Sequence, residues 1–139
     1  MNYKKIPWWE PRIGSPLERT LIEKVFDDNY ANEGDISTQF ETEVAKLLNV
    51  RYAVATTSGT AAIFLALKAS GVGAGDEVIV PDATFIATAN AVSLCGATPI
   101  LVDIDPTTLT ISIEAIENAI TKKTKAIVPV HVTGRPADM

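Results

Sequence analysis

Two hydrophobic patterns alternate along this 139-residue chain: apolar residues at helical spacing, and the short continuous apolar runs typical of buried strands. The first helix is expected to begin after Ser15, because Ser15-Pro16-Leu17-Glu18 has the form of a capping box with proline at the first helical position. Apolar residues then recur at helical spacing, at Leu17, Leu21, Ile22, Val25 and Phe26. After a polar turn at 29–35, a second amphipathic helix is marked by Phe40, Val44, Leu47 and Leu48.

From residue 52 onward the pattern predicts a regular alternation of strands and helices. The expected strands are 52–56, 77–80, 99–102 and 126–130, and the expected helices run from 60 to near 71, over 85–94 and over 112–121. This alternation is typical of a parallel sheet wrapped by helices, so the predicted fold class is α/β. Open parallel sheets bind ligands beyond the carboxyl ends of their strands, which here are 56–60, 81–85, 103–106 and 131–134.

The strand-to-helix junction Thr57-Ser58-Gly59-Thr60 has the properties of an anion seat. The first turn of a helix leaves backbone N–H groups unpaired, and its macrodipole adds partial positive charge there. Gly59 lets the backbone approach a ligand closely, and the neighbouring hydroxyls can donate to phosphate oxygens. Serine and threonine are also ordinary helix caps, so this junction alone does not decide between the two roles.

Three further residues near the expected strand ends each have two interpretations. The ring of Phe85 could stack on a flat heteroaromatic ligand or pack in the core, and its position favours neither. Asn90, in the helix that follows, could bond a pocket group, although a bond to a loop carbonyl is the simpler interpretation. His131 is the only histidine, and its place at a strand end makes it a pocket candidate as well as a possible structural residue.

Two other residue groups invite a functional interpretation that their context does not favour. Asp103 and Asp105 could hold a metal or act as acid and base, but Asp105-Pro106-Thr107-Thr108 is also an ordinary turn. The glycines at 71, 73 and 75 follow a helix and precede a strand, which is the reverse of a dinucleotide fingerprint and favours a helix C-cap and turn. No Walker lysine follows Gly59, which argues against nucleoside triphosphate hydrolysis.

Composition narrows the function classes further. Twelve Lys and Arg against 17 Asp and Glu give a net charge of −5 without a basic run, which argues against nucleic-acid partners. Cys95 is the only cysteine, so an intrachain disulfide and a Cys-rich zinc site are excluded; we expect a buried thiol and a cytoplasmic protein. No apolar run approaches membrane-spanning length, so no membrane association is expected.

The pattern predicts one domain, residues 15–139, preceded by an N-terminal arm, 1–14, that carries Trp8 and Trp9. The last expected strand lies close to Met139, so an edge strand and apolar helix faces would lack neighbours. We therefore expect this sequence to be the front part of a longer protein.

Several motifs occur in a characteristic order: Phe40-Glu41, Ser58-Gly59-Thr60, Gly73-Ala74-Gly75-Asp76-Glu77-Val78-Ile79-Val80-Pro81, Thr84-Phe85, Val102-Asp103-Ile104-Asp105-Pro106 and Pro129-Val130-His131. Together, from about Pro11 to Met139, they closely resemble the DegT/DnrJ/EryC1/StrS family of pyridoxal-phosphate-dependent sugar aminotransferases. The resemblance implies the front part of a three-layer, aspartate-aminotransferase-like large domain of PLP fold type I, with a mostly parallel sheet flanked by helices. It also implies a homodimer whose active sites draw on both subunits, a nucleotide-linked keto sugar as substrate, and glutamate as amino donor.

The resemblance assigns roles residue by residue. Gly59 and Thr60 match the family turn that binds the phosphate of pyridoxal 5'-phosphate, with Ser58 beside them, and Phe85 matches the aromatic position that stacks on the pyridine ring. Asn90 and His131 match recurring family positions, to which we give no chemical role, and complete the predicted cofactor-binding set. The tryptophan arm and residues 30–34 resemble the segment near the substrate mouth.

The family's catalytic lysine and its pyridine-binding aspartate both match positions after Pro129-Val130-His131, beyond Met139. Lys68 and the lysines between 122 and 125 lie away from the rim where that lysine must meet the cofactor. We therefore expect the parent protein to be a transaminase and this chain alone to be inactive. The alternatives are a dehydratase of the same family, in which histidine replaces the lysine, and a non-catalytic module that binds a phosphorylated ligand or a full-length partner. An unrelated nucleotide-binding domain is the least favoured interpretation.

Overall fold

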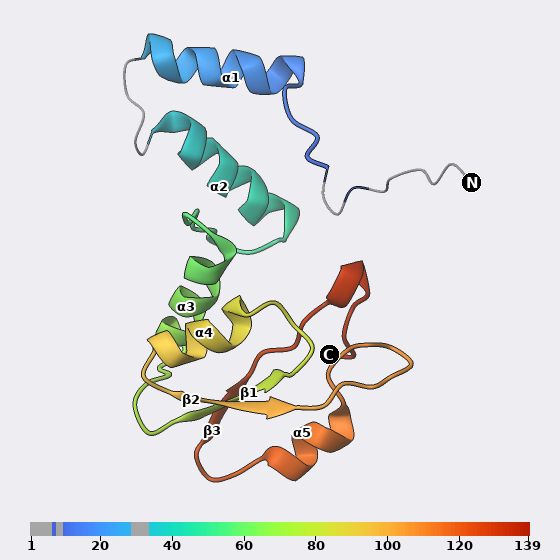
Figure 1. Cartoon of the computed structure of the whole chain (residues 1–139). Coiled ribbons are helices and arrows are strands. Elements are labelled where there is room, and N and C mark those ends of the chain that lie inside the picture. Colours follow the sequence, from blue (N-terminus) through green and yellow to red (C-terminus); the bar gives the residue numbers. More distant parts are fainter. Residues whose placement is uncertain (1–6, 8–9, 29–33) are drawn as a thin grey trace, which may run out of the picture. The chain divides into compact units, whose positions relative to one another are not determined.

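The computed structural model describes residue 7 and residues 10–28 and 34–139 (Figure 1). The chain divides into two compact units, residues 1–55 and 56–139. Trp8 and Trp9, residues 30–33 and most of the polar turn predicted at 29–35 lie outside the described residues.

The N-terminal unit contains two helices, α1 (Pro16–Asp27) and α2 (Asp35–Leu47). The predicted capping box of α1 is confirmed. The Glu18 N–H donates to Ser15 Oγ at 3.2 Å, and the Ser15 N–H donates to Glu18 Oε2 at 2.6 Å. Hydrogen bonds to the Glu18 carboxyl from the side chain and the backbone of Ser15 hold its pKa below the ordinary value, because they favour the ionised form.

The strand predicted at 52–56 is wrong, because this segment is extended but pairs with no strand of the described residues. The Ala55 N–H donates instead to the carboxylate Oε1 of Glu41, at 2.7 Å. Tyr52 and Val54 remain 72% and 76% exposed. The apolar run has the composition of a strand, but a strand also needs a neighbouring backbone to complete its hydrogen bonds.

The C-terminal unit confirms the predicted α/β class. Its elements are α3 (Gly59–Ala69), β1 (Glu77–Pro81), α4 (Ala87–Leu94), β2 (Thr98–Val102), α5 (Ile113–Ala119), β3 (Thr124–Ile127) and the 3₁₀ turn η1 (Val132–Gly134). The strands are parallel in the order β2-β1-β3. Each connection from one strand to the next along the chain crosses over through a helix, α4 between β1 and β2 and α5 between β2 and β3. The strand predicted at 126–130 begins two residues earlier, and the Val128 N–H still donates to the Ile79 carbonyl, at 2.9 Å.

The core lies on both faces of the central strand β1. Val78 and Val80 pack with Leu67 of α3 and with Val92 of α4, whereas Ile79 packs on the opposite face with Val102, Ile111 and Ile116 of α5. This alternation follows from the two-residue period of a strand. The sheet is therefore covered by α3 and α4 on one side and by α5 on the other (Figure 1).

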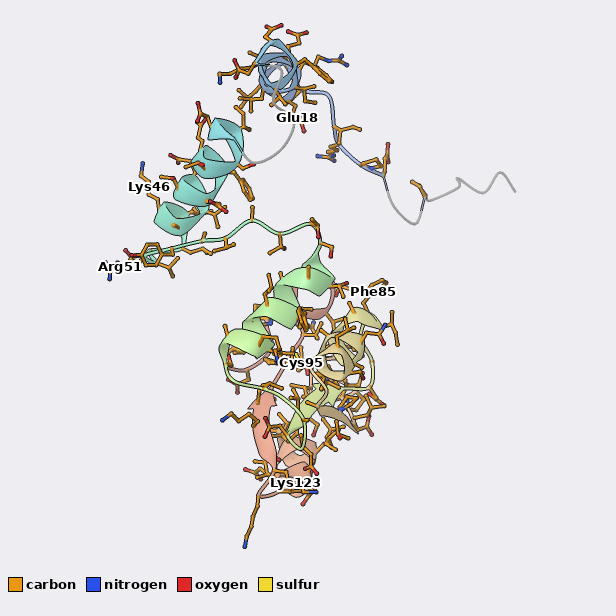
Figure 2. All side chains as sticks on the ribbon, turned by 90° about the vertical axis from the view of Figure 1, so that its left-hand side faces the viewer. Glu18, Lys46, Arg51, Phe85, Cys95 and Lys123 are labelled. Atoms are coloured by element: carbon orange, nitrogen blue, oxygen red, sulfur yellow. The ribbon has the colours of Figure 1, made fainter. Side chains whose placement is uncertain are left out.

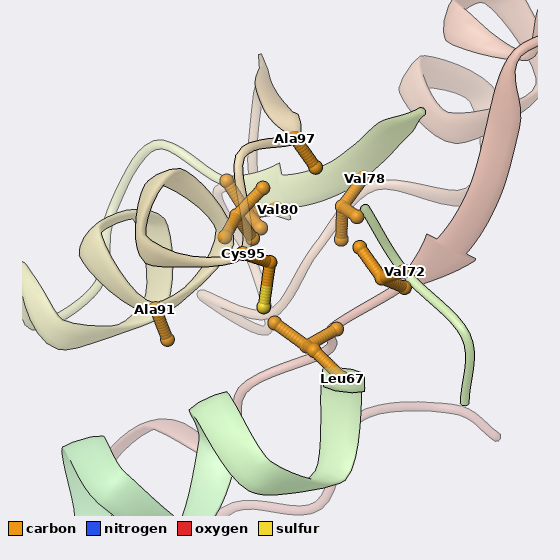
Figure 3. Close-up of a cluster of buried hydrophobic side chains, with 8 residues drawn as sticks. Leu67, Val72, Val78, Val80, Ala91, Cys95 and Ala97 are labelled. Carbon is orange, nitrogen blue, oxygen red and sulfur yellow. The ribbon is translucent and has the colours of Figure 1, made fainter. Parts of the chain in front are cut away.

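Two local predictions in this unit are also confirmed. Gly71 ends α3 with a φ of +78°, and the Val72 N–H reaches back to the Leu67 carbonyl at 3.0 Å, which is the helix-ending arrangement predicted for this glycine. Cys95 is a buried free thiol that points toward Leu67 (Figure 3). None of the helices in the described residues has both the length and the apolar character needed to cross a membrane.

Candidate active site

A cavity of about 480 Å³ opens where the chain leaves β1 and β3, beside the beginning of α3. The cavity thus lies at the carboxyl ends of the parallel strands, where the topology predicts a ligand. In Figure 2, Phe85 lies at the end of the unit where α3 begins, opposite Lys123. The cavity is lined by Gly59, Thr60, Ile63, Thr84, Phe85, Ala87, Thr88, Val128, Pro129, Val130 and His131.

The beginning of α3 contributes free hydrogen-bond donors to this cavity. Ser58 caps the helix, since its Oγ accepts from the Ala61 N–H at 3.2 Å and its carbonyl accepts from the Ala62 N–H at 3.0 Å. The N–H groups of Gly59 and Thr60 donate to no acceptor among the described residues. A helix N-terminus with unpaired donors favours a negatively charged ligand group, so the geometry fits a phosphate.

The aromatic ring of Phe85 is available to a ligand. Its side chain lines the cavity yet is 76% exposed, so the structure excludes the core interpretation that its sequence position left open. It lies between the end of β1 and the first turn of α4, in a tight segment closed by a bond from the Thr88 N–H to the Phe85 carbonyl at 3.1 Å. An exposed ring held by a short connection offers a flat apolar surface for stacking.

His131 lies on the same cavity, directly before η1. Its Nδ1 accepts a hydrogen bond from the Ala137 N–H at 3.0 Å. This contact orients the imidazole with respect to the segment that follows it. The structure therefore brings together four of the six predicted cofactor-binding residues: Gly59, Thr60, Phe85 and His131.

The other two predicted residues do not line the cavity. Ser58 acts as the cap of α3, next to the free donors of that helix. Asn90 is exposed on α4, and its side chain forms no hydrogen bond within the described residues, so its cofactor-binding role stays a prediction.

Sequence reasoning missed two threonines of the cavity as site residues. Thr84 and Thr88 both line it, and their hydroxyls lie 3.0 Å apart. Thr88 is 4% exposed. The signal was present in the sequence, because residues four apart share one side of a helical turn, but a hydroxyl pair has no distinctive motif.

The turn interpretation of Asp105 is confirmed. Its Oδ1 accepts from the N–H groups of Thr107 and Thr108, at 2.7 and 3.0 Å. These two backbone bonds hold the pKa of the Asp105 carboxyl below its ordinary value. Asp103 accepts from the Ile104 N–H at 2.8 Å, and neither aspartate lines the cavity.

The lysines named above lie away from the cavity, as predicted. Lys68 is in the last turn of α3, at the opposite end of that helix from Gly59. Lys125 lies in β3, and Lys122 and Lys123 precede that strand.

Comparison with known proteins identifies the chain. The sequence profile of the DegT/DnrJ/EryC1/StrS aminotransferase family matches residues 14–139. The chain belongs to this family. Aminotransferases of the DegT/DnrJ/EryC1/StrS family depend on pyridoxal phosphate, and the predicted resemblance is confirmed.

Several solved structures are similar to this chain in sequence and fold. S. venezuelae DesV, in complex with a ketimine intermediate, is 41% identical with a TM-score of 0.80, over 86% of this chain and 32% of that one. NtdA from Bacillus subtilis, with bound cofactor PMP, is 43% identical with a TM-score of 0.83, over 86% of this chain and 28% of that one. The aminotransferase from Psychrobacter cryohalolentis is 40% identical with a TM-score of 0.84, over 94% and 33%. The chain thus spans about a third of the length of these three proteins.

The residues of the cavity fit pyridoxal phosphate. The unpaired N–H groups at the beginning of α3 suit its phosphate, and the exposed ring of Phe85 suits its flat pyridine ring. A cavity of about 480 Å³ also lies within the usual range for small-molecule and cofactor sites.

Proposed function

We propose that this chain is the cofactor-binding front part of a pyridoxal-phosphate-dependent aminotransferase. The observation that carries the proposal is the pairing, in one cavity, of free N–H donors at the start of α3 with the exposed ring of Phe85. Either feature alone occurs in many folds. Their combination matches a ligand that is an anion at one end and a flat heteroaromatic ring at the other.

In this proposal three residues of the cavity have defined tasks. The N–H groups of Gly59 and Thr60, both residues of the cavity lining, hold the cofactor phosphate, and the Thr60 hydroxyl adds a further donor. Phe85 stacks on the pyridine ring and restricts its tilt. The bound cofactor acts as an electron sink in amino-group transfer, and this chain binds and orients it.

The proposed substrate rests on the family to which the chain belongs, and the cavity by itself does not indicate it. We propose transfer of an amino group, typically from glutamate, to a nucleotide-linked keto sugar, in a cytoplasmic homodimer whose active sites draw on both subunits. Residues 1–14 would form an arm, and residues 15–139 the beginning of the large domain. DesV, solved with a ketimine intermediate, and NtdA, solved with PMP, match the chain at 41% and 43% identity, which supports the reaction class more than any one substrate.

We further propose that the 139-residue chain alone binds the cofactor without turning over. None of the lysines that the structure describes lines the cavity, so no described amine is positioned to react with the cofactor aldehyde. This favours a binding role for the isolated chain over catalysis.

The phosphate seat can be tested with a proline substitution. Gly59→Pro removes one free N–H, and the helix tolerates it because proline is favoured at the first helical position and Ser58 is extended, with φ −166° and ψ 161°. Apart from its two chain neighbours and the backbone of its own helix, no atom of the described residues lies within 4 Å of a Cβ added at Gly59. Ile113→Pro is the matched control, because Ile113 holds the same first position in α5, after an extended Ser112, and lies outside the cavity.

Binding of pyridoxal phosphate to the chain is measured by equilibrium dialysis, with inorganic phosphate as competitor. We expect Gly59→Pro to weaken binding about ten- to hundredfold, the range of one charge-assisted hydrogen bond, and Ile113→Pro to leave it unchanged. Equal affinities for wild type and Gly59→Pro would refute the phosphate seat.

The reaction class requires the parent polypeptide loaded with pyridoxal phosphate. Addition of glutamate should remove the visible absorption band of the cofactor, and a keto-sugar nucleotide should restore it. A cofactor band that glutamate leaves unchanged would contradict transamination and favour the dehydratase alternative.

A further inference from the structure

One ring nitrogen of His131 accepts a hydrogen bond from the chain itself. The Ala137 N–H donates to Nδ1 at 3.0 Å, so that nitrogen carries no proton in the neutral imidazole and the proton lies on Nε2. Nε2 forms no hydrogen bond among the described residues. The ring nitrogen of His131 that remains for a ligand is therefore an N–H donor rather than an acceptor.

The backbone between His131 and Ala137 is held in an unfavourable conformation. Thr133 has φ +53°, which is rare for a β-branched residue, and Gly134 follows with φ +84°. The turn is closed by bonds from the Gly134 N–H to the His131 carbonyl at 3.2 Å and from the Arg135 N–H to the Val132 carbonyl at 2.9 Å. A conformation of this kind persists only where surrounding contacts stabilise it.

Arg135 makes such a contact with a distant loop. Its Nη1 donates to the carbonyls of Thr107 and Thr108, at 3.0 and 3.3 Å. The carboxylate of Asp105 accepts hydrogen bonds from the N–H groups of the same two threonines. The backbone N–H groups and the carbonyls of Thr107 and Thr108 are therefore both bonded to a charged side chain. The guanidinium of Arg135 thus ties the 131–137 turn to the loop that contains residues 105–108.

We propose that Arg135 is a positioning residue for His131. By fastening the 131–137 turn to the 105–108 loop, Arg135 keeps the Ala137 N–H directed at Nδ1 and so keeps the Nε2–H available to the cavity. The ligand is identified as pyridoxal phosphate only through the proposed function. The coupling between Arg135 and the imidazole is a property of the chain itself and is testable without any ligand.

The test is the tautomer of His131, read from two-bond ¹H–¹⁵N correlation spectra of the untagged chain at alkaline pH. The chain has one histidine, so the imidazole signals need no further assignment. The variants are Arg135→Ala and Arg135→Lys, with Arg51→Ala as control, because Arg51 lies over the Tyr52 ring in the other unit.

We expect only the Nε2–H form in wild type and in Arg51→Ala, and a mixture of tautomers in Arg135→Ala. Arg135→Lys should recover part of the wild-type pattern, since it keeps the charge but not the planar donor group. A spectrum of Arg135→Ala identical to that of wild type would overturn the proposal. If Arg135→Ala does not fold, Arg135→Lys takes its place, and a spectrum of that variant identical to wild type would overturn the proposal. A mixture of tautomers in wild type would overturn it as well.

A second readout connects the tautomer to binding. Arg135→Ala should weaken pyridoxal phosphate binding about two- to twelvefold, the range of one neutral hydrogen bond. Failure of wild type to bind pyridoxal phosphate would refute the proposed function while leaving the tautomer result in force. A tautomer mixture in Arg135→Ala without loss of affinity would show that the Nε2–H does not contact the cofactor, and would overturn the link to binding.

Discussion

Replacement of Phe85 separates binding from folding. The side chain is 76% exposed, so only about a quarter of it contributes to the stability of the free chain. Full burial of such a side chain stabilises a protein by about 1.5–3 kcal/mol, so Phe85→Ala should lower the free energy of unfolding by about 0.4–0.8 kcal/mol. Loss of stacking alone should cost the bound state about 0.5–1.5 kcal/mol, or about two- to thirteenfold in Kd.

Phe85→Leu is the informative partner of this variant, because leucine keeps an apolar side chain but has no aromatic ring. We expect affinity for pyridoxal phosphate to fall in the order wild type, Phe85→Leu, Phe85→Ala, while inorganic phosphate binds all three equally. Binding is measured by equilibrium dialysis, and stability by urea denaturation followed by circular dichroism.

Two results would refute the reasoning about Phe85. Equal affinity of all three chains for pyridoxal phosphate would show that the ring does not stack on the cofactor. A loss of several kcal/mol of stability in Phe85→Leu would show that the ring is part of the core instead of the exposed surface.

Ile79→Ala should lower the free energy of unfolding by about 2–5 kcal/mol in urea denaturation, because Ile79 is fully buried in β1, and a loss below about 1 kcal/mol would contradict that packing. Ser58→Ala should lower stability by about 0.5–2 kcal/mol by removing the cap of α3, whereas Ser58→Asp should retain the cap; equal stability of wild type and Ser58→Ala would exclude the capping role. The pKa of Asp105 is lowered by its bonds from Thr107 and Thr108, so its stabilising contribution is complete above its ordinary pKa of 3.8 and is lost as the pH falls through the lower pKa of the folded state. Asp105→Asn should therefore reduce the acid dependence of the denaturation midpoint below pH 4, and an unchanged acid profile would rule out this linkage.

Local features of the fold could be predicted because their causes are local. The capping box at Ser15 and the helix-ending glycine at 71 depend on residues within one turn of the helix, and both are present as predicted. The order of strands and helices followed from periodicity, and the position of the cavity followed from the rule for parallel sheets.

The predictions that were wrong or missing depend on distant partners. The run at 52–56 has strand composition, yet no composition indicates whether a neighbouring strand is present. Whether the ring of Phe85 is buried depends on what packs over it. Arg135 binds backbone carbonyls of Thr107 and Thr108, which leave no trace in side-chain patterns.

The strand order also determines when the cavity can form. β1 lies in the middle of the sheet and pairs with both β2 and β3. β3 is the last strand of the described residues. Pairing of β1 with β3 closes the whole stretch of chain between Pro81 and Thr124, and closing a long stretch is entropically costly. We therefore expect β3 to join the sheet after the more local contacts of α3, α4, β1 and β2 have formed. Because residues on both sides of β3 in sequence order, Gly59 and His131, line the same cavity, a growing chain can assemble α3 on the ribosome but cannot enclose a cofactor until residue 131 has emerged. Within residues 56–139, cofactor capture is therefore expected to follow the joining of β3 to the sheet, because the cavity is complete only then.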